Sequence, residues 1–123
     1  MRGQRLFIRP IESEDRDTID SFLKAQGKEH SVSACGLLGK LVGDLVAVLT
    51  IEITPEAVRV EQLVVKNELR RKRIGRAMLD ELERFARKMD RERLIAEPGQ
   101  AREFFRRSGF TDEGETWRVR RVR

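Results

Sequence analysis

The segment from Gln62 to Leu79, QLVVKNELRRKRIGRAML, constrains the fold more than any other part of the sequence. An apolar run, Leu63-Val64-Val65, is followed by a short polar turn, by the cations Arg70 to Arg73 and by Gly75. The apolar spacing after this turn predicts an amphipathic helix over 74–89. First-turn N–H groups of a helix have no helical partners, and the helix dipole adds positive charge there. A strand leading through a cationic, glycine-containing turn into a helix therefore indicates a phosphate site.

The length and composition predict one small globular domain spanning residues 1–123. Hydrophobic residues make up 39% and charged residues 38% of the sequence, and no apolar run is long enough to span a membrane. A signal peptide is not expected, because the N-terminal stretch lacks an apolar core segment. With one cysteine and one histidine, the sequence predicts neither a disulfide framework nor a Cys/His zinc site. The lone thiol favours a cytoplasmic location.

The positive charge is concentrated at the turn. The formal net charge of the chain is +5, and residues 66–76 carry six cations against one anion, which is also +5. A nucleic-acid-binding face would spread such charge and would place aromatic residues among the cations. A nucleic-acid-binding protein that uses the basic turn is therefore kept only as a weaker alternative. The six cations are Lys66, Arg70, Arg71, Lys72, Arg73 and Arg76.

The hydrophobic pattern predicts an α+β domain with a mixed sheet. A helix over 14–26 follows a short strand at 6–8, and three consecutive strands then form an antiparallel meander. After the helix at 74–89, a strand at 93–97 is expected to run parallel to 57–65, as in a right-handed βαβ unit. A helix from Pro98 to Gly109 and a hairpin that turns at 112–114 complete the chain. The meander strands are expected at 32–41, 45–53 and 57–65.

This order, together with two motifs, resembles the GCN5-related N-acetyltransferase (GNAT) superfamily. The first motif is the acetyl-CoA signature Q/R-x-x-G-x-G/A, read here from Arg70 to Gly75. The second is A-x-x-F-Y-x-x-x-G-F, read here from Ala101 to Phe110. The resemblance implies a GNAT-like mixed, mostly antiparallel sheet of about 6–7 strands flanked by about three helices. It also implies a splayed parallel strand pair, 57–65 and 93–97, that forms the CoA cleft.

The resemblance further implies an acetyl-CoA-dependent N-acetyltransferase that moves an acetyl group to a primary amine by direct attack. Acetyl-CoA would be the co-substrate, with no metal, and the N–H groups around Val64 would hold the carbonyl oxygen. The acceptor would be a small-molecule or peptide amine, and a homodimer could complete an acceptor site left open by the short N-terminal region. The implied CoA-binding residues are Leu63, Val64, Val65, Arg70, Arg71, Lys72, Arg73, Ile74, Gly75, Arg76 and Phe105.

Two departures from the GNAT pattern affect the chemistry. Arg73 stands where the signature has its first glycine, and Phe105 stands where many relatives have a tyrosine that acts as general acid. The chain contains no tyrosine, so a phenol cannot protonate the leaving thiolate. Glu61 is the candidate base, and the alternative is a surface cross-strand ion pair with Arg59 or a neighbour. A non-catalytic acyl-CoA-binding or regulatory module remains the main alternative.

Three structural expectations concern residues outside the turn. Cys35 is expected to be a buried, small apolar residue of a strand. On the helix at 74–89, the acid-first i,i+4 spacing predicts the ion pairs Asp80–Arg84 and Glu83–Arg87. The arginine-rich tail at 118–123 is expected to be a solvated strand edge or a surface that recruits an acidic acceptor.

Overall fold

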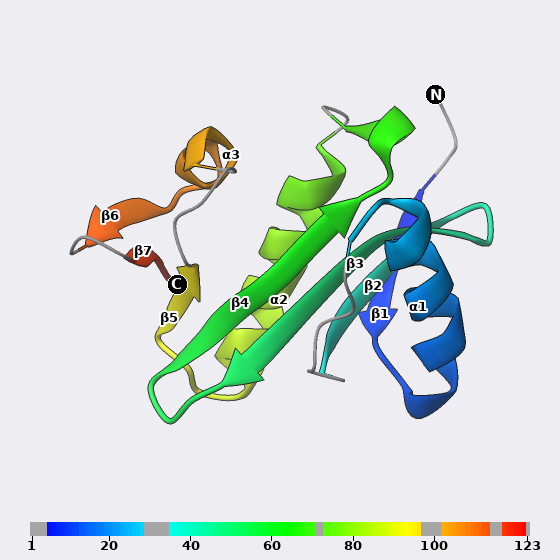
Figure 1. Cartoon of the computed structure of the whole chain (residues 1–123). Coiled ribbons are helices and arrows are strands. Elements are labelled where there is room, and N and C mark those ends of the chain that lie inside the picture. Colours follow the sequence, from blue (N-terminus) through cyan, green and yellow to red (C-terminus); the bar gives the residue numbers. More distant parts are fainter. Residues whose placement is uncertain (1–4, 29–34, 71–72, 97–101, 114–116, 123) are drawn as a thin grey trace.

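Seven strands form one mixed sheet in the order β1-β2-β3-β4-β5-β7-β6 (Figure 1). The computed structural model describes residues 5–28, 35–70, 73–96, 102–113 and 117–122. All neighbouring strands are antiparallel except β4 and β5, which are parallel. This arrangement confirms the predicted meander and βαβ crossover. The strands are β1 (Leu6–Pro10), β2 (Gly36–Leu41), β3 (Asp44–Ile53), β4 (Ala57–Val65), β5 (Arg93–Ala96), β6 (Thr111–Glu113) and β7 (Trp117–Arg121).

The helices lie on both faces of the sheet. A short 3-10 turn, η1 (Ser13–Asp15), leads into α1 (Arg16–Ala25), and a second, η2 (Asn67–Leu69), precedes α2 (Ile74–Lys88). The helix α3 (Arg102–Arg107) follows β5. The predicted start of α3 at 98–101 lies outside the described residues, as do residues 32–34 of the predicted second strand. Within the described residues, no helix is long and apolar enough to cross a membrane.

Two hydrophobic clusters sandwich the sheet. The smaller cluster packs Ile19, Phe22 and Leu23 of α1 against side chains of β2, β3 and β4. The larger cluster packs α2 and α3 against the opposite face, with Met78, Leu79 and Leu82 fully buried. β3 contributes to both clusters, because successive side chains of a strand point to opposite faces. The apolar run at 45–53 is therefore explained by burial on both faces of the central strand.

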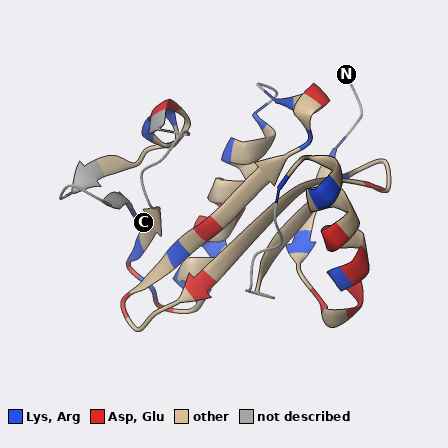
Figure 2. Cartoon of the chain, viewed as in Figure 1, with Lys and Arg blue, Asp and Glu red and all other residues tan. Residues whose placement is uncertain are grey.

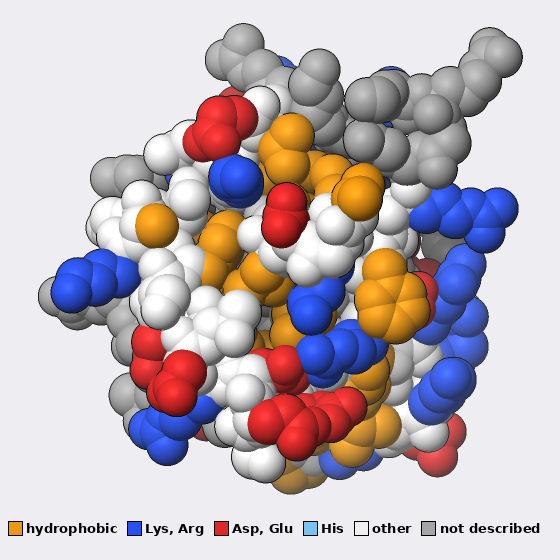
Figure 3. Space-filling model, turned by 90° about the vertical axis from the view of Figure 1, so that its right-hand side faces the viewer, with side chains coloured by type: hydrophobic (Ala, Val, Ile, Leu, Met, Phe, Trp, Pro, Cys, Tyr) orange, Lys and Arg blue, Asp and Glu red, His pale blue; other side chains and the backbone are white. Residues whose placement is uncertain are grey.

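The outer edge of the sheet leaves two large apolar side chains in solvent. Phe7 on β1 is 60% exposed, and Val42 in the β2–β3 turn is 77% exposed. Figure 3 looks onto the side of the molecule that bears β1 and α1, where hydrophobic side chains form a strip among charged ones. Val42 also has φ 49°, a left-handed conformation that β-branched residues rarely adopt.

Three expectations are corrected by the structure. Asp112 and Glu113 belong to β6, so they are not part of the turn of the final hairpin. Cys35 is exposed rather than buried. On α2, Glu83 pairs with Arg87 at 3.1 Å as predicted. Asp80, however, pairs across the fold with a residue of β7, because its place on the helix faces the C-terminal hairpin.

The partner of Asp80 is Arg120, which joins three elements. Its guanidinium lies 2.9 Å from the Asp80 carboxylate and 3.1 Å from that of Glu83, and it also donates to the backbone oxygen of Ser108 at 3.1 Å. The Arg120 side chain is only 17% exposed. This part of the arginine-rich tail is therefore not a solvated edge: Arg120 connects β7 to α2 and to the end of α3 by ion pairs and a hydrogen bond.

A second ion pair, between Arg9 and Asp15, holds the start of α1 in place. Arg9 makes a two-pronged pair with the carboxylate of Asp15, with both N–O distances at 2.7 Å. The same carboxylate accepts the backbone N–H of Glu12 at 2.7 Å. These contacts, led by the Arg9 hydrogen bond, lower the pKa of Asp15 from 3.8 to about 2. Asp15 is nearly buried, so the charged pair connects β1 rigidly to the N-terminal end of α1.

We expect Asp15→Asn to lower the free energy of unfolding by about 2 kcal/mol at pH 7, since one pKa unit corresponds to about 1.4 kcal/mol. A depressed carboxyl pKa contributes stability that is complete above pH 3.8 and is lost as the pH falls towards about 2. The difference between wild type and variant should therefore shrink between pH 4 and pH 2. Urea denaturation across this range measures it.

Asp44→Asn is the matched control, because Asp44 is an exposed carboxylate of the β2–β3 hairpin. Its free energy of unfolding should stay within about 0.5 kcal/mol of wild type. A stability difference between wild type and Asp15→Asn that persists unchanged at pH 2 would show that the ion pair is not its source.

Candidate functional site

The strands β4 and β5 pair over only part of the length of β4. The parallel register joins Ala57 to Val60 with residues 93–96, and β4 then continues to Val65. Within the described residues, no strand pairs with positions 61–65 on the β5 side. Figure 1 shows the two strands diverging beyond the paired stretch. One edge of β4 is therefore open over five residues.

A bulge in β4 marks the point where this divergence begins. Thr50 is opposite Gln62, whereas Ile51 is opposite Val60, so Glu61 is an extra residue in β4. A bulge of this kind bends its strand and increases the local twist. The bend lies directly after the last residue that pairs with β5, which explains why the two strands part there.

The alternation of an antiparallel ladder decides which backbone groups face the open edge. Lys66 donates its N–H to the oxygen of Val46 on β3 at 2.8 Å. Val64 therefore also points its backbone groups at β3, while those of Leu63 and Val65 point at the open edge. The N–H groups around Val64 were expected to hold a ligand oxygen, and within that stretch the N–H groups of Leu63 and Val65 face the open edge.

The side chains of the same residues are part of the core. Val64 is buried in the smaller cluster under α1. Leu63 and Val65 are partly buried and pack against the larger cluster on the α2 side. The open edge therefore presents backbone polar groups flanked by apolar side chains, which suits a ligand that is itself an extended amide chain.

The turn between β4 and α2 ends in a left-handed residue. Arg73, the N-cap of α2, has φ 64° and ψ 15°, and its oxygen accepts the N–H of Ala77 at 3.1 Å. The N–H groups of Ile74, Gly75 and Arg76 precede that first helical bond and have no partner within the helix. Arg71 and Lys72, also expected to bind phosphate, lie outside the described residues.

Three cations are close in sequence to these N–H groups. Arg70, Arg73 and Arg76 are exposed, and the described part of the chain provides none of them with an ion-pair partner. Lys66, by contrast, lies 3.7 Å from the carboxylate of Glu68. Figure 2 shows Lys and Arg at this turn and at the first turn of α2. The N–H groups, the helix dipole and the cations together favour an anion here.

Glu61, the candidate base, lies on the bulge and is exposed. Partial burial raises the pKa of the Cys35 thiol, and the negative charge of Glu61 raises it further by a smaller amount. The alternative ion pair between Glu61 and Arg59 is not seen, and Arg59 instead pairs with Glu52 at 3.2 Å. Among the described residues, Glu61 has no ion-pair partner.

The sequence matches the model of the acetyltransferase (GNAT) family over residues 4–110. The chain belongs to the GNAT family. No curated protein sequence matches it significantly. The predicted GNAT fold, with its seven strands and three α-helices, is confirmed.

Solved structures agree with this assignment of the fold. N-acetylglutamate synthase from Neisseria gonorrhoeae, in complex with coenzyme A and N-acetyl-glutamate, superposes with a TM-score of 0.82 at 17% identity over 97% of this chain. This chain spans 35% of that protein, or about a third of its length.

Two structures from Escherichia coli are of more similar length. The ribosomal-protein-S18-alanine N-acetyltransferase has a TM-score of 0.76 at 14% identity, over 96% of this chain and 94% of its own. A GNAT-family N-acetyltransferase in complex with CoA has a TM-score of 0.76 at 15% identity, over 100% of this chain and 84% of its own. At these identities the likeness establishes the fold.

The first glycine of the GNAT signature is replaced by Arg73, and the structure shows what that position demands. A φ of 64° is free for glycine but costs other residues about 1 kcal/mol or more. A glycine at this position lets the backbone come close to a ligand. The conformation of Arg73 shows that backbone geometry is a second reason for it.

The second glycine of the signature, Gly75, is required by packing. A Cβ at Gly75 would lie 2.8 Å from Cζ and 3.0 Å from Cε1 of Phe104 on α3. It would also lie 3.7 Å from a methyl group of Leu63. The two GNAT motifs therefore meet in space, because the ring of Phe104 in the second motif packs against Gly75 in the first.

Phe105, at the tyrosine position, belongs to the core. Its ring makes edge-to-face contacts with Phe104 at 5.2 Å and with Phe110 at 5.1 Å between centroids. Phe105 is 8% exposed and is part of the larger hydrophobic cluster. The structure therefore gives Phe105 a packing role, and its contact with the cofactor stays a prediction.

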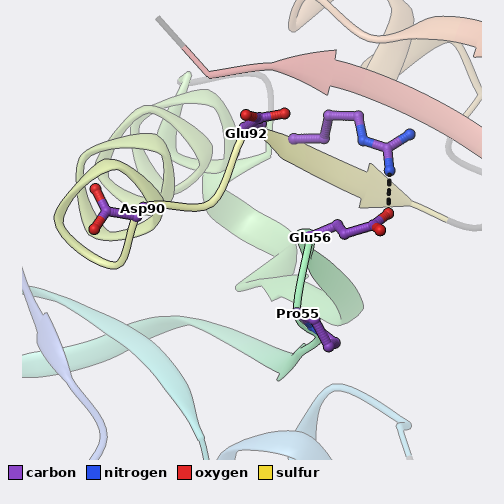
Figure 4. Close-up of a pocket in the computed structure, with 5 residues that line it drawn as sticks. Pro55, Glu56, Asp90 and Glu92 are labelled. Carbon is purple, nitrogen blue, oxygen red and sulfur yellow. Dashed lines mark hydrogen bonds and ion pairs between the residues drawn. The ribbon is translucent and has the colours of Figure 1, made fainter.

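A surface hollow of about 450 Å³ lies at the opposite end of the sheet from the turn. Pro55 and Glu56 line it from the β3–β4 connection, Asp90 and Glu92 from the connection between α2 and β5, and Arg93 from the start of β5 (Figure 4). Arg93 lies 3.2 Å from the Glu56 carboxylate. With three carboxylates and one paired guanidinium, this hollow does not suit a polyanion. The open edge and the turn are the candidate site.

Sequence reasoning missed two residues that position this site. Gln26, at the end of α1, accepts the backbone N–H of Asn67 at 2.9 Å. Leu69, in the turn, packs against the larger cluster. Leu69 could have been found from the sequence, because it is an apolar residue inside a basic turn. Gln26 could not, because its contact joins residues 41 positions apart and no local sequence pattern indicates it.

We expect Gly75→Ala to lower the free energy of unfolding by about 1 kcal/mol. Alanine favours the helix by up to about 1 kcal/mol, but the added methyl group must displace the Phe104 ring, and overpacking typically costs about 1–3 kcal/mol. Denaturant unfolding measures the difference. The matched variant is Gly75→Ala combined with Phe104→Leu, in which the space is free and the cost of the alanine should disappear. A Gly75→Ala protein more stable than wild type would refute the packing argument.

Proposed function

We propose that this GNAT protein transfers the acetyl group of acetyl-CoA to a primary amine by direct attack. The observation that carries the proposal is the match to the GNAT family over residues 4–110. Its support in the fold is the open edge of β4 that leads into a cationic helix N-terminus. The pantetheine arm would pair with the backbone of Leu63 and Val65, and the pyrophosphate would lie on the N–H groups of Ile74, Gly75 and Arg76.

In the proposed reaction, the amine nitrogen attacks the thioester carbonyl carbon, and the carbonyl oxygen becomes an oxyanion. The N–H groups on the open edge would stabilise that charge. The C–S bond then breaks, the thiolate of CoA leaves, and the amine nitrogen loses a proton. Holding the two reactants together is the main source of rate in such a step.

Two proton transfers complete the balance. Glu61 would accept the proton of the amine, directly or through water. The thiolate would take its proton from water, since the chain has no tyrosine. A thiol has a pKa near 8.5, so the thiolate is an acceptable leaving group without an acid. This is consistent with the packing role of Phe105.

The acceptor is proposed as a small-molecule or peptide amine. The similar structures include one complexed with N-acetyl-glutamate and one that is a ribosomal-protein alanine N-acetyltransferase. Both belong to other proteins, and their chemistry supports the class of primary amines and no single acceptor. A cytoplasmic location and a homodimer stay predictions.

Calorimetry with CoA, acetyl-CoA and ATP, followed by thiol release in the presence of a panel of amines, tests the function. We expect both CoA species to bind more tightly than ATP and at least one amine to release thiol. No binding of either CoA species at millimolar concentration would refute the proposal. Binding without thiol release from any amine would instead support a non-catalytic acyl-CoA-binding module.

We expect Glu61→Gln to lower kcat about 10²- to 10⁴-fold, the usual loss on removing a general base, with the affinity for acetyl-CoA unchanged. The loss should be smaller at high pH, where more of the amine is already deprotonated. Stopped-flow thiol release and calorimetry measure the two quantities. Glu92→Gln, an exposed change at the other end of the sheet, is the control. An unchanged kcat would remove Glu61 from the mechanism.

The role of Arg73 is tested by comparing Arg73→Gly with Arg73→Ala. Both variants lose the guanidinium, so both should bind CoA about 3- to 10-fold more weakly at low salt, a value typical of one exposed charge-assisted contact. Only glycine relieves the left-handed backbone, so Arg73→Gly should be about 1 kcal/mol more stable than Arg73→Ala. Calorimetry and urea denaturation separate the two effects. Equal stability of the two variants would contradict the claim of backbone strain at Arg73. Wild-type affinity in both would contradict the role of its guanidinium in CoA binding.

A further inference from the structure

The turn that follows β4 is anchored at three points. The N–H of Lys66 donates to Val46 on β3 at 2.8 Å, and the side chain of Leu69 packs against the larger cluster. The third anchor is the N–H of Asn67, which donates to Oε1 of Gln26 at 2.9 Å. The first two anchors belong to the sheet and the main core. The third comes from α1, on the other face.

The end of α1 holds Gln26 in place. Gly27 has φ 72°, its N–H donates to Lys24 at 3.0 Å, and the N–H of Lys28 donates to Leu23 at 2.8 Å. These bonds form a Schellman motif, which closes a helix with a left-handed residue just beyond its C-cap. Gln26 is that C-cap. Its backbone is fixed between the helix and the closing turn, so its side chain reaches Asn67 from a defined position.

Loss of the hydrogen bond between Gln26 and Asn67 is expected to change the position of the turn more than the free energy of unfolding. Asn67 is the first residue of η2, and Arg70 closes that turn by donating to the Asn67 oxygen at 3.3 Å. The contact is exposed, so water can replace the lost partner at little cost to folding. What would change is the direction in which the chain leaves β4.

We propose that Gln26 is a positioning residue for the coenzyme A turn, acting through its hydrogen bond to the N–H of Asn67. The inference rests on the proposed function, which places the pyrophosphate on the N–H groups of Ile74, Gly75 and Arg76, at the end of the connection that begins at Asn67. It links α1 to the cofactor, although α1 packs on the opposite face of the sheet from α2. The net worth of one hydrogen bond corresponds to about a 2- to 10-fold change in affinity.

Three variants test the proposal by calorimetry with CoA. Gln26→Met keeps the length of the side chain and removes the acceptor. Asn67→Pro removes the donor, and proline suits this position because Asn67 is the first residue of the 3-10 turn and Lys66 has an extended ψ of 132°. Ser21→Met puts the same new side chain at an exposed position of α1 and is the matched control.

We expect Gln26→Met and Asn67→Pro each to weaken CoA binding about 3- to 10-fold. The double variant should bind no more weakly than either single one, because both remove the same bond. Ser21→Met should bind as wild type, and the urea midpoints of Gln26→Met and Ser21→Met should agree. Hydrogen exchange of the Asn67 amide should become faster in Gln26→Met but not in Ser21→Met.

Wild-type affinity in Gln26→Met, or additive losses in the double variant, would overturn the role of Gln26 while leaving the proposed function standing. Wild-type protein that binds no CoA would overturn both. If Asn67→Pro loses its cooperative unfolding transition, exchange of the Asn67 amide decides: an unchanged rate in Gln26→Met refutes the proposal, and a faster rate together with weaker CoA binding supports it.

Discussion

The pairing between β3 and β4 is the constraint on which the candidate site depends. Along β4 the ladder to β3 is continuous except at one residue, and that residue, Glu61, is the bulge. The pairing with β5 ends directly before it. Because β3 is buried on both faces, the ladder cannot shift to absorb the extra residue, and the strain is released by bending β4 away from β5. A single inserted residue in a rigid sheet thus creates an edge that no strand of the described residues pairs with.

The elements of the fold could be predicted from the sequence, because their signals are local. The doubly buried strand at 45–53, the amphipathic pattern of α2 and the strand–turn–helix order each depend on neighbouring residues, and the structure confirms them. The proposed anion site also rests on a local signal. Its cations and Gly75 lie within a few residues of one another in the sequence.

The details that decide the geometry of the site depend on contacts between distant residues. The bulge at Glu61 appears only when β4 is aligned with β3, and it moves the open backbone groups from Val64 to Leu63 and Val65. Arg120 looked like part of a solvated tail because its partners on α2 are about 40 residues away.

The central strand also has a mechanical consequence for the molecule. Val48 and Leu49 are adjacent on β3, both have no exposed surface, and they belong to different hydrophobic clusters. Any displacement of β3 along or across the sheet must therefore disturb the packing of α1 and of α2 at the same time. The two faces therefore behave as one cooperative unit. A change in the packing of α1 affects the packing of α2 through β3, because both helices cover that strand.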